Sequence, residues 1–451
     1  MGIFKAYDIR GVYPEELNEE IARKIGAAFI RFLGARSSVV GRDMRLSSPA
    51  LAWAFIEGAR AAGADVTDIG MVTTPLLYYA LIDGQYESGA MVTASHLPGH
   101  MNGFKLCSEK AIPLSRDHGL PEVENLSGGR FDFRPGSFRG LYRSAQVFER
   151  YIEHISRFVH DPVPIRIVVD AGNGIAGPEV ARIFEKFPVW DATTIYMEPD
   201  GNFPHHVANP LIPENTLDLQ ERVKKEGADI GVAFDGDADR CGFIDERGDR
   251  ISEDLVTALI AQFYLLREPG AKIIYDLRSS RIVPETIAGL NGIPVRCRVG
   301  HSFIKEKMRE ENAVFAGELS GHYYYRDTGF TDNALFTMLQ MFNFLAVKRE
   351  PLSSLISPLR KYRSTGEINL EVRDIDKIYA VLKKTYADGR QDCLDGLTVS
   401  YDHWWFNLRA SNTEPLIRLN LEADDSPAME EKKREVLDRI READPEMKVK
   451  D

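Results

Sequence analysis

The sequence predicts an α/β protein of three or four domains that ends in a smaller α+β domain. At 451 residues the chain exceeds the size at which one hydrophobic core keeps growing, so several domains are expected. Short β-branched runs alternate with amphipathic stretches as far as Lys361, which is the rhythm of parallel or mixed sheets. After Arg363 the pattern changes to strands followed by a charged final helix, which indicates a domain of another type.

The strands expected before this change are short runs rich in Val and Ile. They include SVVG (38–41), ADVTDIG (64–70), RIVVDAG (166–172), ADIGVAFDGD (228–237) and KIIYDL (272–277). Apolar residues recur at helical spacing between them, as in segments 47–63 and 177–187. Ser47 and Ser48 are placed to cap the first of these helices. The strand-helix unit recurs three times, although the units share too little identity to prove a repeat.

Charge and cysteine usage exclude several classes of partner. The net charge of −12 argues against a nucleic-acid backbone or an anionic membrane surface, and no obligate protein partner is indicated. The longest apolar stretch, around 255–266, is far short of the roughly 20 residues that a membrane span requires. Neither a disulfide framework nor a zinc cluster is indicated by the widely spaced Cys107, Cys241, Cys297 and Cys393. A cytoplasmic protein is expected.

A serine loop is the first candidate for chemistry. TASHLPGHMNGFK (93–105) follows the apolar run GAMV, so a strand is expected to deliver Ser95 to a loop. His96 stands beside this serine, and Lys105 lies ten residues further on. A nucleophilic hydroxyl needs a base, and positive charge around the group that it transfers. These residues therefore favour a nucleophile, with an ordinary capped turn as the alternative.

An acidic loop is the second candidate. GVAFDGDADR (231–240) places Asp235, Asp237 and Asp239 at alternate positions directly after an apolar run. Carboxylates so close together repel one another unless a hard cation draws them together, so a divalent metal site is predicted. An EF-hand is a poor match, because Arg240 occupies the position where the sharp turn needs glycine. An aspartyl-phosphate phosphatase and a solvated acidic turn remain alternatives.

A glycine loop offers a competing interpretation. Gly172, Gly174 and Gly177 have the spacing of a dinucleotide-binding loop, and Glu198 lies about 20 residues beyond it. A NAD-dependent dehydrogenase is therefore one alternative. The glycines serve equally well for close packing of a strand against a helix, and a dehydrogenase has no need of the other motifs. Packing is the preferred interpretation.

Two further loops are suited to binding sugar and phosphate. GELSGHYYYRD (317–327) presents Glu318, Ser320 and His322 at alternate positions, where they can meet sugar hydroxyls. RASNTEP (409–415) is unusually dense in donors for phosphate oxygens, which are Arg409, Ser411, Asn412 and Thr413. Taken singly, each loop is equally well explained as a polar turn.

Together, and in this order, the motifs resemble those of the α-D-phosphohexomutase family. The resemblance covers essentially the whole chain, from FKAYDIRG at the start through VGRDMRLSS (40–48) to RASNTEP. It implies four domains around a central cleft, of which three are related α/β mixed-sheet domains and the last is a smaller C-terminal α+β domain. The implied limits are 1–145 with the phosphoserine loop, 146–249 with the metal loop, 250–363 with the sugar loop and 364–451 for phosphate binding.

The resemblance also implies an activity. Members interconvert hexose 1-phosphates and 6-phosphates, here of mannose and/or glucose, through a phosphoserine and a hexose 1,6-bisphosphate. Mg²⁺ is the implied cofactor, the bisphosphate the implied activator, and sugar phosphates the implied partners. GELSGH looks closer to the GEMSGH pattern of phosphomannomutase/phosphoglucomutases than to the GEQSGH of phosphoglucosamine mutases, which remain an alternative. A non-catalytic sugar-phosphate sensor is another.

Roles are carried over from the family to the matching positions only. Ser95 resembles the phosphorylated serine, which binds the metal together with Asp235, Asp237 and Asp239. The implied catalytic groups are Ser95, His96, Arg10, Lys105 and His301, and which of them is the general base stays open. The implied substrate-binding residues are Tyr7, Arg240, Arg278, Glu318, Ser320, His322, Arg409, Ser411, Asn412 and Thr413. Two positions depart from the usual pattern: Leu97 stands where the family commonly has Asn, and Arg278 where relatives often carry Lys.

Overall fold

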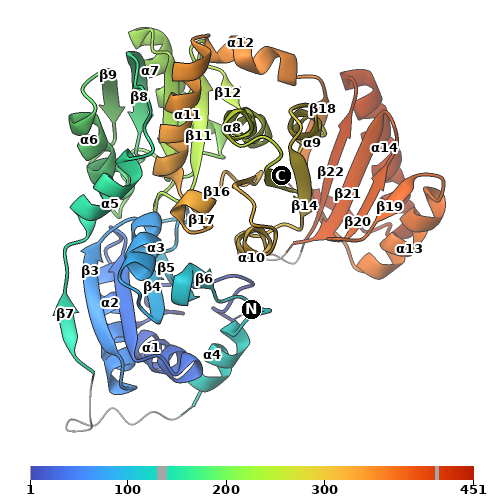
Figure 1. The fold of residues 1–451 in the computed structure, drawn as a ribbon. Helices are drawn as coiled ribbons and strands as arrows, with labels where there is room; N and C mark the ends of the chain where they lie inside the picture. The colour runs from blue at the N-terminus through green and yellow to red at the C-terminus, as the bar shows by residue number, and fades with distance from the viewer. Residues whose placement is uncertain (1, 130–139, 412–415, 451) are drawn as a thin grey trace.

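The computed structural model describes residues 2–129, 140–411 and 416–450, and Figure 1 shows its ribbon. Within these residues the strands form four sheets that follow one another along the chain. The blue first domain leads through the short strand β7 (Tyr142–Ser144) to the green second domain, and the red C-terminal domain lies beyond the third. The predicted three mixed-sheet α/β domains and smaller C-terminal α+β domain are confirmed, and the sheet of the last domain is antiparallel.

The first three sheets share one four-strand core. The strand orders are β5-β4-β2-β3, β11-β10-β8-β9 and β16-β15-β13-β14. In each core the first three strands in sequence are parallel to one another, and the fourth runs antiparallel beside the third. The topology therefore contains the repeat that sequence identity alone was too weak to prove.

The first sheet has the order β1-β5-β4-β2-β3-β7, with β6 paired to β5. Its other strands are β1 (Ile9–Val12), β2 (Ser37–Arg42), β3 (Asp65–Met71), β4 (Ser88–Val92), β5 (Met101–Ser108) and β6 (Ile112–Pro113). Its helices are α1 (Glu19–Leu33), α2 (Ser48–Ala61), α3 (Thr74–Asp83) and α4 (Leu120–Ser127), with a short 3₁₀ turn η1 (Glu109–Ala111). Strands β2 and β4 are buried along most of their length, as expected of strands covered on both faces.

The predicted serine cap of α2 is wrong. Ser47 precedes the helix but makes no capping hydrogen bond; its hydroxyl instead accepts one from Nδ2 of Asn102, at 2.8 Å. Ser48 accepts a second from the same amide, at 2.9 Å. Asn102 lies in β5, on the far side of the serine loop, so a tertiary partner has replaced the local one. The two serines hold the start of α2 against the strand that follows Ser95.

The second and third sheets have the orders β12-β11-β10-β8-β9 and β14-β13-β15-β16-β17. The second domain contains α5 (Phe148–Ser156), β8 (Ile165–Asp170), α6 (Gly177–Lys186), β9 (Trp190–Ile195), η2 (Pro213–Thr216), α7 (Leu217–Glu226), β10 (Ile230–Phe234), β11 (Cys241–Asp245) and β12 (Arg250–Ile251). The third contains α8 (Glu253–Arg267), β13 (Lys272–Asp276), α9 (Ile282–Gly289), β14 (Ile293–Cys297), α10 (His301–Glu311), β15 (Phe315–Gly317), β16 (Tyr323–Tyr325), η3 (Arg326–Thr328), β17 (Thr331–Asp332), α11 (Ala334–Lys348), α12 (Leu352–Ile356) and η4 (Ser357–Leu359).

The fourth sheet is antiparallel and has the order β19-β20-β21-β22-β18-β23. Its elements are β18 (Arg363–Glu371), α13 (Ile375–Thr385), β19 (Arg390–Asp392), β20 (Leu397–Ser400), β21 (Trp404–Ala410), β22 (Ile417–Ala423), α14 (Ser426–Ala443) and β23 (Lys448–Lys450). In the described part of the chain, no helix combines the length and the apolar character needed to cross a membrane.

The hydrophobic cores show how the domains are joined. One apolar cluster continues through the first three domains, whereas the fourth domain has a core of its own. The contact between the third and fourth domains is polar: Arg281 lies 3.4 Å from Glu422 and 2.7 Å from Asp424. The C-terminal domain is therefore attached by ion pairs, which is typical of domains that move relative to their neighbours.

A buried carboxyl group lies where the first and second domains meet. Glu179 of α6 is 2% exposed, and its Oε1 accepts a hydrogen bond of 2.8 Å from the hydroxyl of Thr73, the residue before α3. Burial raises the pKa of Glu179 to about 8. In the unfolded chain the same group titrates at about 4.3. The folded protein therefore keeps a proton that the unfolded chain has already released between these two pH values.

We expect Glu179→Gln to flatten the dependence of stability on pH. Because the folded-state pKa is raised, Glu179 lowers the free energy of unfolding progressively as pH rises from about 4.5 to about 8, and then no further. The free energy of unfolding can be measured in urea at about pH 5.5 and pH 8. Between these pH values the variant's free energy of unfolding, relative to that of the wild type, should increase by on the order of 2 kcal/mol or more. Glu221→Gln, an exposed change on α7, is the control. An equal pH dependence in wild type and Glu179→Gln would contradict the expectation.

Candidate active site

The polar loops predicted from the sequence occupy one topological position in the repeated core. The loop with Ser95 joins β4 to β5, the loop with the three aspartates joins β10 to β11, and the loop with Glu318 joins β15 to β16. Each is the turn between the third and fourth strands of its core. The fourth loop likewise joins two antiparallel neighbours, β21 and β22. The repeat itself therefore brings corresponding loops of different domains together.

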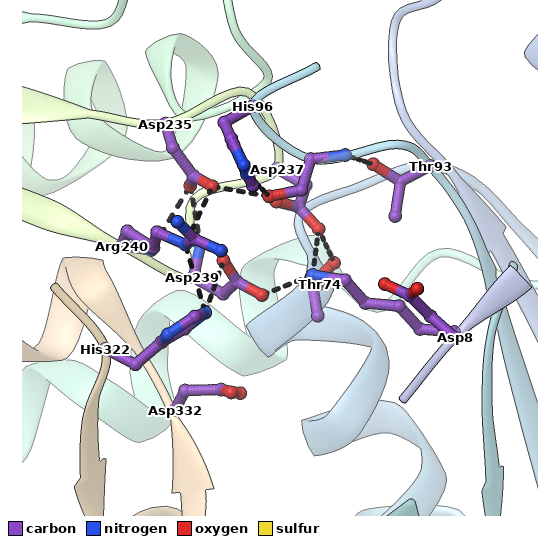
Figure 2. Close-up of polar contacts among 12 residues, drawn as sticks. Asp8, Thr74, Thr93, His96, Asp235, Asp237, Asp239, Arg240, His322 and Asp332 are labelled. Atoms are coloured by element: carbon purple, nitrogen blue, oxygen red, sulfur yellow. Dashed lines mark hydrogen bonds and ion pairs between the residues drawn. The ribbon is translucent and has the colours of Figure 1, made fainter. Parts of the chain in front are cut away.

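Ser95 lies at the meeting point of the first two domains, where its partners Asp235 and His96 are labelled in Figure 2. Its Oγ donates a hydrogen bond of 2.8 Å to Oδ2 of Asp235 and lies 3.1 Å from Nδ1 of His96. Because the hydroxyl hydrogen goes to Asp235, the second contact requires the proton of the His96 ring to be on Nδ1. Burial and the guanidinium groups of Arg240 and Arg10 lower the pKa of His96. The serine is thus held between a carboxylate and a neutral imidazole.

Arg45 fixes the main chain of the serine loop. Its guanidinium makes five hydrogen bonds, one to Asp43 and four to the carbonyl oxygens of Ser95, Leu97, Pro98 and Met101, at 2.6 to 3.0 Å. All five N–H donors of the side chain are therefore used. Ser95 itself has a φ of 52°, a left-handed conformation that a non-glycine residue keeps only where its surroundings impose it.

The acidic loop lies directly against the serine loop. A Cβ atom on Gly236 would lie 2.4 Å from the carbonyl oxygen of Ser95, so only glycine permits this approach. The carboxylates of Asp235, Asp237 and Asp239 are fully or almost fully buried, and each offers an oxygen within 4.8 Å of the others. Such a group of hard oxygen ligands is suited to a metal ion.

The individual oxygens support a metal site. Oδ1 of Asp237 and Oδ1 of Asp239 are buried and have no hydrogen-bond partner among the described residues. Their Oδ2 atoms both accept hydrogen bonds from the ammonium group of Lys105, in β5, and that to Asp237 measures 2.6 Å. Oδ1 of Asp239 also lies 3.5 Å from Nε2 of His322, and Oδ2 of Asp235 lies 3.9 Å from Nε of Arg240, so Lys105 is not alone in offsetting the buried negative charge. Oδ1 of Asp237 is the buried oxygen most available to a metal ion.

Burial and neighbouring charges shift the pKa values of the groups in this cluster. Burial and the carboxylates of Asp239 and Asp237 raise the pKa of Asp235. Although burial opposes it, Lys105 holds the pKa of Asp239 well below its usual range. The same carboxylates raise the pKa of Lys105 against the effect of its burial, so this side chain stays an ammonium ion.

Arg10 belongs to the first domain and His301 to the third, and both lie near the site. Nε of Arg10, in β1, lies 2.7 Å from Oδ2 of Asp8, which orients the guanidinium. His301 begins α10, and its ring lies 5.4 Å from that of Tyr7 and 6.2 Å from that of His322. Nδ1 of His301 is buried and has no hydrogen-bond partner in the described parts of the chain. Burial, followed by the charge of Lys305, lowers the pKa of His301, so its imidazole is neutral.

The sugar-loop residues join the metal loop through Arg240. Nε of Arg240 donates to Nε2 of His322 at 3.2 Å, and the backbones of these two residues form an isolated bridge between the second and third domains. Nδ1 of His322 lies 2.9 Å from the hydroxyl of Ser320 and 3.4 Å from Oε2 of Glu318. Although burial opposes it, His322 and Arg278 hold the pKa of Glu318 below its usual value, so it is an acceptor.

A cluster of arginines connects the third and fourth domains. Glu367 of β18 lies 2.8 Å from Arg409, 2.9 Å from Arg418 and 3.5 Å from Arg278. Arg278 is also bound to Asp276, at 2.8 Å. Arg409 and Arg418 share the carboxylate of Glu367, while Arg278 is also paired with Asp276, so the cluster is rich in guanidinium donors. Nε of Arg409 is buried and has no hydrogen-bond partner within the described residues, so the cluster is suited to an anion.

The structure brings most of the predicted residues together. Ser411 lies at the described edge of its loop, whereas Asn412 and Thr413 lie outside the described residues. Leu97, where an amide was expected, contributes its carbonyl oxygen to Arg45. Sequence reasoning missed the roles of Arg45, Thr74 and Glu367. Only Arg45 had left a signal, because it belongs to the VGRDMRLSS motif.

The glycine loop is a packing element. A Cβ atom on Gly177 would lie 1.9 Å from the carbonyl oxygen of Met197, and one on Gly174 would lie 3.0 Å from those of Asp235 and Gly236. The backbone N–H of Ile175 donates to the carbonyl oxygen of Gly236 at 3.0 Å. Gly174 and Gly177 therefore serve close packing, although against the metal loop and Met197, where the sequence predicted the packing of a strand against a helix.

The chain matches four family models in order. The models described as phosphoglucomutase/phosphomannomutase alpha/beta/alpha domains I, II and III match residues 1–127, 149–248 and 252–362. The model of the phosphoglucomutase/phosphomannomutase C-terminal domain matches residues 367–439. Together the four models cover most of the chain.

Full-length relatives agree with these matches. A phosphomannomutase of Salmonella montevideo is 40% identical over 446 residues, which cover 96% of this chain and 98% of that protein. A protein named phosphohexose mutases from Xanthomonas campestris pv. campestris is 39% identical over 444 residues, with 97% and 99% covered. The crystal structure of a phosphoglucomutase/phosphomannomutase family protein from Burkholderia thailandensis has a TM-score of 0.91 at 36% identity, with 99% and 98% covered.

We expect Arg45→Lys to loosen the serine loop. Lysine offers three donors in place of five, so at least two of the present acceptors lose their partner, at a cost of about 2–5 kcal/mol in the free energy of unfolding. Hydrogen exchange should show faster exchange of the amides of residues 95–101. Arg23→Lys, at a partly exposed pair with Glu57 between α1 and α2, is the matched control. Unchanged exchange of the loop in Arg45→Lys would refute this role of Arg45.

Proposed function

Because this chain belongs to the phosphoglucomutase/phosphomannomutase family, whose members are mutases, we propose that it moves phosphate between O1 and O6 of mannose and glucose. The observation that carries the proposal is the Ser95 hydroxyl, 2.8 Å from the buried carboxylate of Asp235 and 3.1 Å from the ring of His96. Two full-length relatives, one named phosphomannomutase and the other phosphohexose mutases, support the choice of sugar.

Ser95 Oγ carries the phosphoryl group between turnovers. A free hydroxyl of the bound sugar monophosphate, at O6 or O1, attacks the phosphorus, the bond from phosphorus to Oγ breaks, and the hydroxyl proton passes to a base. The resulting 1,6-bisphosphate reorients, and Oγ takes back the other phosphoryl group. A hexose 1,6-bisphosphate is accordingly the activator that charges an unphosphorylated chain.

The three aspartates would hold Mg²⁺ together with an oxygen of phosphorylated Ser95. When bound, the ion neutralises charge on the phosphoryl group. The chain's own contribution is position, since Gly236 lets the acidic loop touch the main chain of Ser95 and Arg45 fixes that main chain. The phosphoryl carrier and the carboxylates are therefore held in one rigid arrangement.

We assign proton transfer at the sugar hydroxyl to His301. Its lowered pKa keeps the ring neutral and able to accept a proton, and its buried Nδ1 has no partner among the described groups. Lys105 and Arg10 remain cations and stabilise negative charge in the transition state. His96 orients the Ser95 hydroxyl through the contact at 3.1 Å.

The sugar would be recognised by the loop between β15 and β16. Glu318 and Ser320 can bind the 3- and 4-hydroxyls. His322 and Arg240 lie beside them and complete the proposed sugar-binding surface. Mannose and glucose differ only at C2, so both offer the same hydroxyls to Glu318 and Ser320. Leu319 in GELSGH favours this pair over glucosamine, whose mutases have Gln at that position.

The phosphate that is not reacting would be bound by the arginine cluster. Arg409 and Ser411 can donate to its oxygens. We assign Arg278 and Tyr7 to the border between the sugar and phosphate positions. We also assign Asn412 and Thr413 to the phosphate-binding loop by their place in the motif. The same group must bind in both orientations of the bisphosphate. We propose that the polar contact of the fourth domain lets the site open for this reorientation.

The proposed setting is the cytoplasm. All four cysteines are free, and three of them are buried. Small sugar phosphates are the proposed partners, which agrees with a local cluster of cations on a chain whose net charge is −12.

A coupled mutase assay tests the proposed function. Mannose, glucose and glucosamine 1-phosphates are compared as substrates, with Mg²⁺ and a hexose 1,6-bisphosphate present. Turnover of the mannose and glucose compounds is expected to exceed that of the glucosamine compound by tenfold or more, about the discrimination of one well-placed contact. Preference for glucosamine 1-phosphate would make the chain a phosphoglucosamine mutase, and no turnover of any of them would favour a sensor.

We expect Ser95→Ala to remove nearly all turnover, by about four orders of magnitude or more, because it deletes the phosphoryl carrier and leaves the sugar and phosphate contacts in place. Calorimetry should show binding of glucose 6-phosphate within about threefold of wild type. Ser115→Ala, which removes a buried hydroxyl without a hydrogen-bond partner in the described structure, is the control and should turn over normally. Near-normal turnover of Ser95→Ala would exclude the phosphoserine mechanism.

We expect Arg409→Ala to raise KM for the 1-phosphate and the 6-phosphate alike. The loss of a charged hydrogen bond to the non-reacting phosphate costs roughly 1.5–3 kcal/mol, or about 10- to 150-fold in KM. Some fall in kcat should accompany it, because remote binding energy helps to close the site. Arg439→Ala, on the exposed face of α14, serves as the control. An effect on only one isomer, or on neither, would show that this arginine is not a shared phosphate anchor.

A further inference from the structure

The metal loop is held from the first domain by the first residue of α3. The hydroxyl of Thr74 donates a hydrogen bond of 2.6 Å to Oδ2 of Asp237, and its backbone N–H donates one of 3.0 Å to the carbonyl oxygen of the same aspartate. Both residues are fully buried. One residue of the first domain thus fixes both the main chain and the side chain of a proposed metal ligand in the second (Figure 2).

The helix that carries Thr74 is itself anchored. The hydroxyl of the preceding residue, Thr73, donates to Glu179 of α6 at 2.8 Å and accepts from the backbone N–H of Leu76 at 3.2 Å. The first turn of α3 is therefore bound on one side to α6 and on the other to the metal loop. Because Glu179 is largely uncharged near neutral pH, it anchors the helix without adding a full negative charge behind the acidic loop.

The hydrogen bond from Thr74 divides the two oxygens of Asp237 between different tasks. Oδ2 accepts from Thr74 and from Lys105, whereas Oδ1 is buried without a hydrogen-bond partner in the described structure. A hydroxyl is a neutral donor, so it orients the carboxylate without competing with a cation for its charge. The β-branched side chain of threonine also has few rotamers, which makes this orientation stiff.

We propose that Thr74 is a positioning residue that leaves Oδ1 of Asp237 directed to the metal, and so makes the metal affinity of the second domain depend on a contact from the first. The proposal rests on the metal site proposed above. It assigns a role to a residue that contacts neither the sugar nor the phosphoryl group, and it gives the contact between the two domains a direct chemical consequence.

Calorimetric titration of the full-length, unphosphorylated chain with Mg²⁺ tests the proposal. Thr74→Val keeps the shape of the side chain but removes the donor, and we expect the Kd for Mg²⁺ to rise about tenfold, as for the loss of one charge-assisted hydrogen bond. Thr74→Ser keeps the hydroxyl and should stay within about threefold of the wild type. Thr257→Val, a buried threonine whose hydroxyl bonds to its own helix 2.8 Å away, is the matched control and should leave the Kd unchanged.

The possible outcomes distinguish an error in the role of Thr74 from an error in the metal site itself. If the wild type binds Mg²⁺ and Thr74→Val binds it equally well, the role of Thr74 is overturned while the metal site stands. If the wild type does not bind Mg²⁺ at all, the metal site falls and this proposal falls with it. If circular dichroism shows that the valine variant folds poorly, Thr74→Ala, which only removes atoms, replaces it. The Kd for Mg²⁺ should again rise about tenfold, and an unchanged Kd would overturn the role of Thr74.

Discussion

The arrangement of the site depends on the burial of three carboxylates in a single turn. Asp235, Asp237 and Asp239 lie within a few ångströms of one another, and the cost of burying them must be met by cations and hydrogen-bond donors. Lys105 comes from β5 of the first domain, and Thr74 from its α3. The serine hydroxyl binds the same turn. The acidic turn thus binds the groups that hold the first and second domains together, and the Ser95 hydroxyl lies among them.

The repeated topology explains why the remaining groups arrive at the same place. Each of the first three sheets ends its core with a turn from a parallel strand to an antiparallel neighbour, and these turns carry Ser95, the aspartates and Glu318. Bridges between domains follow from this, such as that of Arg240 with His322. The fourth domain has another topology and its own core, and it contributes through the arginines around Glu367.

The sequence predicted the parts of the structure that depend on local pattern. Strand and helix periodicity was sufficient for the mixed sheets and for the change of fold after Arg363, and closely spaced polar residues marked the loops. It did not predict partners that the fold brings together from a distance. Thr74 and Asp237 are 163 residues apart, and Arg409 and Glu367 are 42 apart. The prediction for the two serines at the start of α2 was wrong for the same reason, because Asn102 binds their hydroxyls in place of the expected local cap.

Mass spectrometry of the intact chain can test whether Ser95 is the phosphoryl carrier. We expect incubation with a hexose 1,6-bisphosphate and Mg²⁺ to add one phosphoryl group, which peptide mapping should assign to Ser95. A mannose or glucose monophosphate should then remove it. A phosphoryl group found on Asp235 would instead support an aspartyl-phosphate mechanism. A chain that turns over substrate and never carries phosphate on Ser95 would show that this serine is not the carrier.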